Sequence, residues 1–177
     1  MAEQPVLQGD YLGFRLAVSN IDVENLEFFR WCGKGELRLQ KCVDCCLQRY
    51  PPTTACPWCT QPDATWEPVE GKGELFSYGE VHHAIQPQFR EHLPYMMILV
   101  ELDTQRGQPT EHEAIRFVGN LSEADGSLAT PETVRKAGIG TRLKVVLKDV
   151  GEGFAIPLWA VDESAPQPAT PWRYAQE

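Results

Sequence analysis

Two closely spaced cysteine pairs constrain this chain more than any other feature of its sequence. Two residues separate Cys42 from Cys45, and after ten more residues Cys56 and Cys59 repeat the spacing. Two residues between thiolates let one tight turn present both sulfurs to a cation, at about 2.3 Å for zinc, and two such turns complete a tetrahedron. The spacing therefore predicts one Zn²⁺ on Cys42, Cys45, Cys56 and Cys59, with iron in the same cage as the alternative.

A cage of four thiolates leaves the metal no open position for water or substrate, so we expect a structural ion rather than a catalytic one. Cys46 and Thr60 follow the second cysteine of each pair, where glycine is common because it tolerates the turn, so we expect a slightly distorted site. Only Cys45, not Cys46, keeps the two-residue spacing. Cys32 is expected to be a small buried apolar side chain.

The remaining pattern is one helix followed by strands. Residues 22–34 carry apolar side chains at helical spacing behind Asp22 as the N-cap. Beyond Trp66, alternating runs separated by Gly, Pro and polar turns predict strands at residues 73–85, 95–103, 114–121, 142–150 and 154–161. Five such strands favour a small barrel of the oligonucleotide/oligosaccharide-binding (OB) type, with a short helix within residues 129–140.

The ends of the chain have a different composition. The first 20 residues show no convincing period and the last dozen are rich in Pro, Ala and Gln, so both ends are expected to be arms or tails. Trp172 and Tyr174 are unusual in a solvated tail and are expected to dock on the body or on a partner. We divide the chain into an arm (1–21), a helical segment (22–37), a zinc ribbon (38–68), an OB-fold domain (69–162) and a tail (163–177).

Charge and hydropathy exclude some classes of protein. Acidic residues outnumber basic ones by 25 to 16, and the resulting net charge of -9 argues against a generic binder of nucleic acid or anionic membranes. The N-terminus lacks the pattern of a signal peptide, and the longest apolar run, residues 96–100, is too short to cross a bilayer. We therefore expect a cytoplasmic protein whose cysteines are thiols or metal ligands rather than disulfides.

No familiar catalytic constellation is present: the sequence has no G-x-S-x-G, no H-E-x-x-H, no P-loop and no dinucleotide fingerprint. Alternation within residues 73–85 places Phe76, Tyr78 and His82 on one face. That face either lines a ligand groove or forms a half-exposed aromatic surface packed on another part of the molecule or on a partner.

Basic residues alternate along the strand at 142–150. Arg142, Lys144 and Lys148 are expected to point outward, with Arg116 on a neighbouring strand. This row either meets the phosphates of a nucleotide-like ligand or is simply a solvated strand face.

Taken in order, these segments resemble the DUF35 family. The resemblance is carried by FFRWCGKGELRLQKCVDCCLQRYPPTTACPWC, TWEPVEGKGELFSYGEVHH, LPYMMILVELD and VRKAGIGTRLKVVLKD, and it spans about residues 22–161. It implies a mainly β fold with an N-terminal helix or helical hairpin, a rubredoxin-like zinc ribbon and a C-terminal five-stranded OB-fold barrel. The arm, the polar loop at 104–113 and the aromatic tail depart from a minimal member.

The resemblance also implies a function. A DUF35 protein of this kind is a non-catalytic accessory subunit of a thiolase-superfamily enzyme, either a thiolase or an aldolase, that acts on an acyl-CoA thioester such as a steroid side-chain or aromatic one. A MaoC-type enoyl-CoA hydratase and a ketoacyl synthase-like acyltransferase are alternative partners. We therefore expect a thiolase-like partner in a hetero-oligomer and a CoA thioester as ligand. The expected acyl-CoA-binding residues are Phe76, Tyr78, His82, Tyr95, Arg116 and Lys144.

Two other classes stay open on the residues alone. Zinc ribbons and OB folds also occur in single-stranded nucleic-acid-binding proteins, although the acidity of this chain argues against that function. Iron in the cysteine cage would indicate an electron-transfer protein. The apolar residues of the helix are expected to be exposed, which would make the chain insoluble without a partner: Leu26, Phe28, Phe29 and Trp31.

Overall fold

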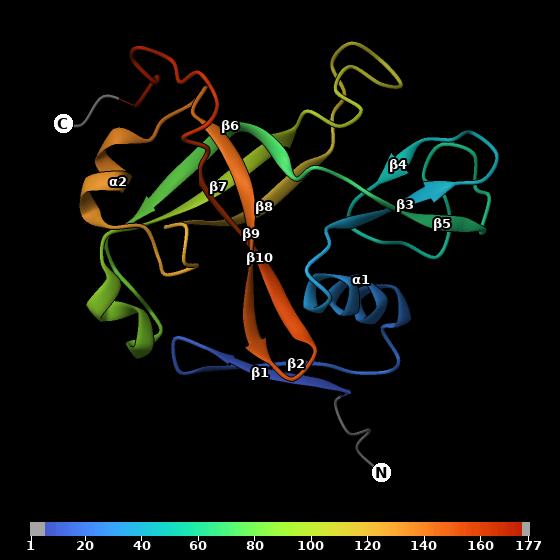
Figure 1. Ribbon diagram of the computed structural model, residues 1–177, viewed down its shortest axis with the longest axis horizontal. Coiled ribbons are helices and arrows are strands. Elements are labelled where there is room, and N and C mark those ends of the chain that lie inside the picture. The colour runs from blue at the N-terminus through green and yellow to red at the C-terminus, as the bar shows by residue number, and fades with distance from the viewer. Residues whose placement is uncertain (1–5, 175–177) are drawn as a thin grey trace.

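The computed structural model describes residues 6–174 and has a closed barrel at its centre (Figure 1). The strands are β1 (Leu7–Tyr11), β2 (Phe14–Val18), β3 (Arg38–Cys42), β4 (Gln48–Arg49), β5 (Ala64–Pro68), β6 (Lys72–Val81), β7 (Tyr95–Leu102), β8 (Arg116–Ser122), β9 (Arg142–Gly151) and β10 (Phe154–Val161). The helices are α1 (Val23–Gly33), the 3-10 helix η1 (Pro87–His92) and α2 (Pro131–Lys136). In the described part of the chain no helix is both long and apolar enough to cross a membrane.

The barrel is closed by five strands in the order β10-β8-β7-β6-β9, with β6 paired to β9 across the seam. Strands β8 and β10 are parallel, the other neighbours are antiparallel, and α2 lies between β8 and β9 in the chain. Its interior is apolar, with Leu75, Phe117, Leu143 and Trp159 fully buried. This is the topology of an OB fold, so the predicted fold class is confirmed.

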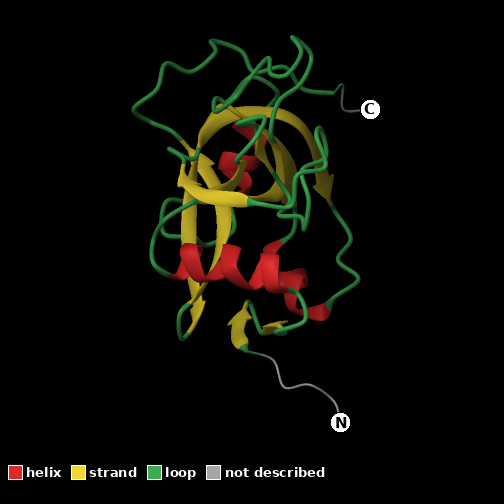
Figure 2. Ribbon diagram, turned by 90° about the vertical axis from the view of Figure 1, so that its right-hand side faces the viewer, coloured by secondary structure: helices red, strands yellow, loops and turns green. Residues whose placement is uncertain are grey.

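Helix α1 lies across one end of the barrel (Figure 2). The Asp22 carboxylate accepts a hydrogen bond from the Asn25 N–H at 3.3 Å and so caps the first turn. The prediction that the apolar residues of this helix are exposed is wrong. Leu26 and Phe28 are only 5% and 1% exposed, and Phe29 and Trp31 are half-buried. The helix therefore buries its apolar face in its own chain rather than keeping it for a partner.

A β-hairpin precedes α1, where the sequence predicted an arm without secondary structure. Strands β1 and β2 pair through a two-residue turn, in which Leu12 and Gly13 have φ values of 55° and 75°. Such turns favour Asn-Gly, so leucine at the first position hides the signal from a sequence reading. The hairpin packs on the far end of β9, where Val150 joins Leu7 in a second apolar cluster. The arm prediction is wrong for Leu7–Val18, and the N-terminal helix has no helical hairpin partner within the described residues.

The ribbon forms a separate three-stranded sheet in the order β4-β3-β5, beside the barrel (Figure 1). Tyr50, just after β4, stacks on Phe117 of the barrel with ring centroids 3.5 Å apart and an interplanar angle of 19°. Gln105, after β7, exchanges two hydrogen bonds with the backbone of Gln48, at 2.6 Å and 2.9 Å. Aromatic stacking and this pair of hydrogen bonds from the Gln105 side-chain amide thus fix the ribbon against the barrel.

The C-terminal tail folds back on the barrel. Trp172 and Ile139 exchange two backbone hydrogen bonds, at 2.9 Å and 3.1 Å, and the Tyr174 N–H donates to the Tyr78 hydroxyl at 2.9 Å. Docking of these two aromatic residues on the body, one of the two predicted outcomes, is confirmed. The ends of the predicted arm and tail, residues 1–5 and 175–177, lie outside the described residues.

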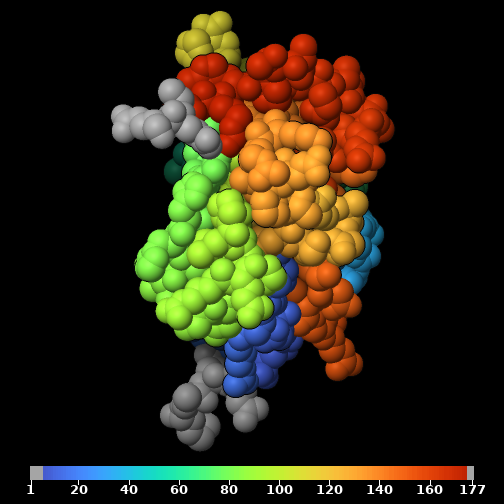
Figure 3. All heavy atoms as spheres, turned by 90° about the vertical axis from the view of Figure 1, so that its left-hand side faces the viewer, coloured from blue at the N-terminus to red at the C-terminus, as the bar shows by residue number. Residues whose placement is uncertain are grey.

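One arginine holds the tail next to α2, and Figure 3 shows the tail and this helix together on one face. The Arg173 guanidinium donates to the backbone carbonyls of Val134, at 2.7 Å, and Ala137, and it also pairs with the Glu80 carboxylate. These partners come from α2, the residue after it and β6, so Arg173 holds the tail against α2 and the barrel.

Candidate functional site

Four cysteine sulfurs come together where the two ribbon turns meet. The sulfurs of Cys42, Cys45, Cys56 and Cys59 all lie within 4.8 Å of one another. The Cys42–Cys59 and Cys45–Cys56 sulfur pairs are each 3.5 Å apart. A tetrahedron with zinc–sulfur bonds of about 2.3 Å has edges of about 3.8 Å, so the donor set fits a tetrahedral cation. The four residues could hold one metal ion with all four positions filled by protein.

Backbone N–H groups reach these sulfurs in the same pattern in both turns. In each turn the sulfur of the first cysteine, Cys42 or Cys56, accepts hydrogen bonds from the backbone N–H groups two and three residues later. The sulfur of the second cysteine, Cys45 or Cys59, accepts one from the N–H two residues later. Burial opposes ionisation of Cys56, but these N–H groups and the neighbouring thiols outweigh it and lower its pKa to about 6. The Leu47 N–H lowers the pKa of Cys45, but burial and the neighbouring thiols raise it overall, to about 12. A tetrathiolate metal site requires all four thiols to be ionised. Thiols this close together do not all ionise unless a cation lies between them, because their negative charges repel one another.

The residue after the second cysteine of each turn has a left-handed backbone conformation. Cys46 has φ 60° and Thr60 has φ 65°, a region that costs a non-glycine residue about 1–2 kcal/mol. The expected strain is therefore present in the backbone of both turns. The Cys46 sulfur lies 3.9 Å from the Asp44 carbonyl oxygen, while the sulfur in the cage is that of Cys45.

A β-bulge separates the aromatic residues that the sequence placed on one face. In the pairing of β6 with β7 the register shifts between Leu75 and Ser77, which leaves Phe76 as the extra residue. Phe76 is 44% exposed, whereas Tyr78, opposite the buried Ile98, packs against the core. The prediction that Phe76 and Tyr78 share a face is wrong, because strict alternation does not hold across a bulge.

The predicted basic row is also divided. Arg116 was predicted to lie on a strand beside β9. It lies on β8, whose neighbours are β7 and β10, so this prediction is wrong. Its Nε and Nη2 donate to the Glu101 carboxylate at 3.0 Å and 2.8 Å, and its guanidinium lies 4.2 Å from the Phe76 ring centroid. Lys144, on β9, lines a hollow of about 540 Å³ between α2, β10 and the tail.

The other two predicted ligand residues lie elsewhere. The His82 side chain is 69% exposed, with Nε2 3.4 Å from a Glu80 carboxylate oxygen. Tyr95 packs against Phe89 of η1, with ring centroids 5.3 Å apart. The six residues expected to bind acyl-CoA therefore do not converge on one site in this structure. Cys32 is 1% exposed, and burial raises its pKa to about 12, so the prediction of an inert buried thiol is confirmed.

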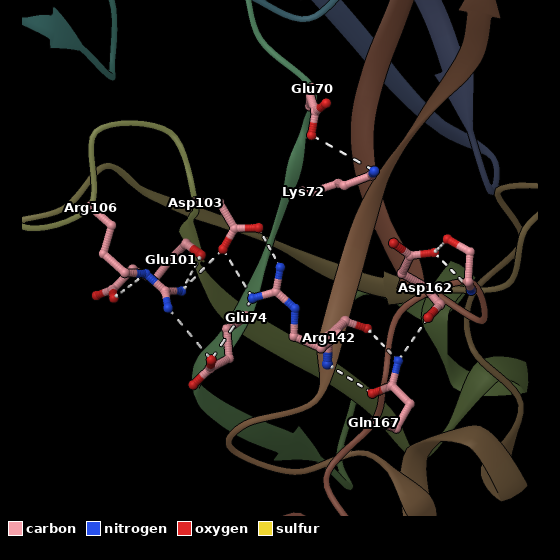
Figure 4. A network of polar contacts seen from close by, with 10 residues as sticks. Glu70, Lys72, Glu74, Glu101, Asp103, Arg106, Arg142, Asp162 and Gln167 are labelled. Atoms are coloured by element: carbon pink, nitrogen blue, oxygen red, sulfur yellow. Dashed lines mark hydrogen bonds and ion pairs between the residues drawn. The ribbon is translucent and has the colours of Figure 1, made fainter.

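A network of charges lies at the seam where β6 pairs with β9 (Figure 4). Arg142 of β9 forms a two-pronged pair with Asp103, which follows β7, and this hydrogen bond holds the pKa of the Asp103 carboxyl below its usual range. Arg106 contacts Glu74 at 3.7 Å and Glu101 at 3.2 Å. Arg142 is thus committed to a structural pair and is not free to meet a ligand's phosphate.

A second hollow, of about 300 Å³, lies between the ribbon and the loop that joins β7 to β8. Arg49 lines it and is only 3% exposed. No sequence pattern singles out this arginine, because one basic residue in a two-residue strand has no pattern of its own. Within the ribbon its guanidinium donates to the Gln40 side-chain oxygen and to the Thr53 carbonyl.

Comparison with known proteins gives matches of three kinds. Residues 66–148 match the family model described as the C-terminal OB-fold domain of ChsH2. The probable enoyl-CoA hydratase alpha subunit of Thermomonospora curvata is 37% identical over 103 residues, which make up 57% of this chain and 28% of that protein. The chain thus spans about a quarter of the length of this curated relative.

Two solved structures are also similar. One, described as the Ltp2-ChsH2(DUF35) aldolase, is 27% identical with a TM-score of 0.60, and the match covers 78% of this chain and 94% of that chain. The other, a protein of unknown function from the DUF35 family of Sulfolobus solfataricus, is 12% identical with a TM-score of 0.49, and the match covers 80% and 87% of the two chains.

Proposed function

We propose that this chain is a protein of the DUF35 family and a non-catalytic accessory subunit of an enzyme that acts on an acyl-CoA thioester. The observation that carries the proposal is the likeness to the Ltp2-ChsH2(DUF35) aldolase, which covers 94% of the matched chain. A cage in which four cysteines surround the ion supports it, since such a site has no position left for a reactant. The chemistry would then belong to the partner.

We propose zinc as the ion in the cage, held by Cys42, Cys45, Cys56 and Cys59. When bound, the ion supplies a structural cross-link between the two ribbon turns. The N–H groups that point at the sulfurs stabilise the thiolates and orient them toward the ion. The folded ribbon in turn presents Tyr50 to Phe117 and so keeps its position against the barrel.

The partner that we propose is a thiolase-like protein acting as an aldolase, with a steroid side-chain or aromatic acyl-CoA among its substrates. In this hetero-oligomer the chain supports the partner and forms part of the acyl-CoA channel. The name of the aldolase structure supports this choice of partner over the ketoacyl synthase-like acyltransferase. We also propose a cytoplasmic location, in keeping with cysteines that are all free in the described residues.

Reconstitution tests the proposal. The chain and a thiolase-like protein from the same source are produced separately and together, and the cleavage of a β-hydroxyacyl-CoA into a carbonyl product and a shorter acyl-CoA is followed. We expect the two proteins to co-purify and cleavage to need both. Cleavage at the full rate by either protein alone, or failure of the two to associate, would contradict the proposal.

A second candidate partner is an enoyl-CoA hydratase of the MaoC type. The identity of 37% to the probable enoyl-CoA hydratase alpha subunit favours it. The two candidates differ in the reaction that depends on the chain: hydration of a C=C bond adds water, whereas aldol cleavage breaks a C–C bond. Running both assays with each partner separates them, and an effect on hydration alone would favour the hydratase.

A further inference from the structure

We infer that residues 168–174 form a strap that opens and closes over a docking site on the barrel, and that this site recognises an extended peptide with an aromatic–Arg–aromatic pattern. In the structure the site holds the chain's own Trp172, Arg173 and Tyr174. We name it the tail site, and it consists of the residues of β6, α2 and the turn after α2 that contact the strap: Tyr78, Glu80, Val134, Ala137 and Ile139. The inference rests on these contacts and not on the proposed function.

The backbone of the strap joins the barrel through one antiparallel bridge. The Ile139 N–H donates to the Trp172 carbonyl at 2.9 Å, and the Trp172 N–H donates to the Ile139 carbonyl at 3.1 Å. A Cβ on Gly138 would lie 2.5 Å from the Trp172 carbonyl oxygen, so the close approach of the strap depends on this glycine. Main-chain bonds of this kind hold any extended segment, and specificity comes from the side chains.

Arg173 supplies that specificity. Its guanidinium donates to the carbonyls of Val134, at 2.7 Å, and Ala137, and it pairs with the Glu80 carboxylate. The last carbonyls of a helix have no N–H partner within the helix, so a donor from outside satisfies them. The side chains of Arg173 and Glu80 are only 20% and 13% exposed, which shields the pair from water. The planar fork of arginine serves several acceptors at once, whereas lysine carries a single compact ammonium.

Two aromatic residues flank the arginine. The Tyr174 N–H donates to the Tyr78 hydroxyl at 2.9 Å, and the centroids of these two rings are 5.3 Å apart. The Trp172 and Tyr174 rings meet edge to face at 4.6 Å, and the Arg173 guanidinium lies 5.3 Å from the Tyr78 ring centroid. The contacts therefore define a short pattern, aromatic–Arg–aromatic, that the tail site recognises.

The strap is held without a buried side chain. None of residues 163–174 is buried, and Trp172 and Tyr174 are each 54% exposed although they dock. Segments with few buried apolar contacts and exposed hydrogen bonds open at a small cost in free energy compared with core elements. The elements beneath the strap are different, since Leu75 of β6 and Val134 of α2 are fully buried. We therefore expect the strap to open while the barrel stays folded.

Gln167 marks the point at which the strap begins. Its side-chain amide donates to the Asp162 carbonyl at 2.8 Å, and its oxygen accepts the Arg142 N–H at 2.9 Å, which ties the chain up to this residue to β9 and to the end of β10. Beyond it, Pro168 and Pro171 have no N–H to donate to the barrel. The strap thus pivots after Gln167. Both prolines line one side of the hollow of about 540 Å³ beside α2, so opening also widens access to this hollow.

Hydrogen exchange on the full, zinc-loaded wild-type chain tests the opening. We expect the Ile139 and Trp172 amides to exchange about a hundredfold faster than the amides of β7, because only the strap has to open. Arg173→Gln removes the guanidinium and should speed exchange at both amides by about a further tenfold. Arg135→Gln, which removes an exposed cation from α2 itself, is the matched control and should leave both rates unchanged.

A peptide added in trans tests the specificity. The probe is a labelled peptide with the sequence of residues 165–174, and its binding to the full chain is followed by fluorescence anisotropy. The wild-type strap competes for the tail site, so we expect the peptide to bind the Arg173→Gln chain about tenfold more tightly than the wild-type chain. A peptide that carries the same R173Q change should bind neither chain.

Glu80→Gln provides a second variant. Placed in the Arg173→Gln chain, it removes the carboxylate that pairs with the arginine and should weaken peptide binding about tenfold. Glu152→Gln in the same background, an exposed carboxylate in the β9–β10 turn, is the matched control and should leave the affinity unchanged. Zinc content and circular dichroism are measured for each variant, so that a change in the fold is recognised.

In the wild-type chain, Ile139 and Trp172 amides that exchange as slowly as those of β7 would overturn the strap. Peptide binding that is absent from the Arg173→Gln chain, equal in the two chains, or equal for the two peptides would overturn recognition by the tail site. Neither experiment needs a partner enzyme, so both outcomes are independent of the proposed function.

Discussion

The ribbon and the barrel, which touch through Tyr50 and Phe117, are stabilised in different ways. The barrel has a continuous apolar interior, and its Phe117 and Trp159 pack edge to face with centroids 5.6 Å apart. Within the ribbon the fully buried apolar side chains are few, and the two turns meet at four sulfurs rather than at a core. The comparison leads us to expect that the barrel folds on burial of apolar surface, whereas the ribbon depends on the cation that its four cysteines could hold.

The largest expected effect is loss of the cation. Cys56→Ser removes one thiolate from the cage, and zinc-finger peptides derive about 10–16 kcal/mol of apparent free energy from such a site. We expect zinc content to fall from one ion per chain to none and the ribbon to unfold while the barrel stays folded. Metal analysis and circular dichroism check this result. The control is Cys46→Ser, whose sulfur lies outside the cage and whose zinc content should not change.

The second largest expected effect is on the stability of the barrel, from a substitution in its core. Phe117 is fully buried against Tyr50, Phe28 and Trp159, so Phe117→Ala should lower the free energy of unfolding by about 3–5 kcal/mol. Denaturant melts measure it, and zinc content should stay at one ion. Val118→Ala, at the next position but 65% exposed, should change stability by less than about 0.5 kcal/mol. Loss of zinc from Phe117→Ala would mean that the two regions are not independent.

A substitution at the contact between α1 and the β9–β10 turn should lower stability by less than Phe117→Ala does. A Cβ on Gly33 would overlap the carbonyl oxygen of Gly153, so Gly33→Ala must displace the helix or the turn, at about 1–3 kcal/mol. Gly79→Ala is the matched control, since a Cβ there meets nothing within 4 Å, and it should be neutral or stabilising. Equal melting temperatures for the two variants would contradict the close packing of α1 on the barrel.

The smallest effect concerns the seam network. The Arg142 hydrogen bond lowers the pKa of Asp103 in the folded chain, so the pair adds stability above the unfolded pKa of about 3.9, and this stability is lost as the pH falls through the lower folded value. Because the pair is partly exposed, Asp103→Asn should cost at most about 1 kcal/mol at pH 7.

Melts of Asp103→Asn and wild type between pH 7 and pH 2.5 should therefore converge on the acid side. Glu152→Gln, an exposed carboxylate in the β9–β10 turn, provides the baseline. A difference between Asp103→Asn and wild type that grows as the pH falls would have the wrong sign for a depressed carboxyl pKa.

Local pattern explains what could be predicted from the sequence. The ligand spacing, the helix after Asp22 and the five barrel strands depend on residues that are close in the chain, and all appear in the structure. The hairpin at Leu7–Val18 was missed because Leu12 occupies a turn position that usually has Asn. The bulge at Phe76 reverses the alternation that placed the aromatic residues.

The candidate ligand sites could not be read from local pattern. Arg116 and Lys144 are separated by the strand order of the barrel, which alternation along one strand does not contain. Arg49 lines a hollow whose other wall is the β7–β8 loop, and that loop meets the ribbon through contacts between residues 57 positions apart such as Gln48 and Gln105. Such sites depend on how the two regions meet.

Hydrogen exchange on the full chain, with zinc bound and after its removal by a chelator, tests most directly whether the ribbon alone depends on a metal. We predict that zinc removal abolishes protection of the amides in β3, β4 and β5 and leaves those in β6 to β10 within about twofold of their zinc-bound rates. Ribbon amides that stay protected without metal, or barrel amides that lose protection together with them, would contradict the account.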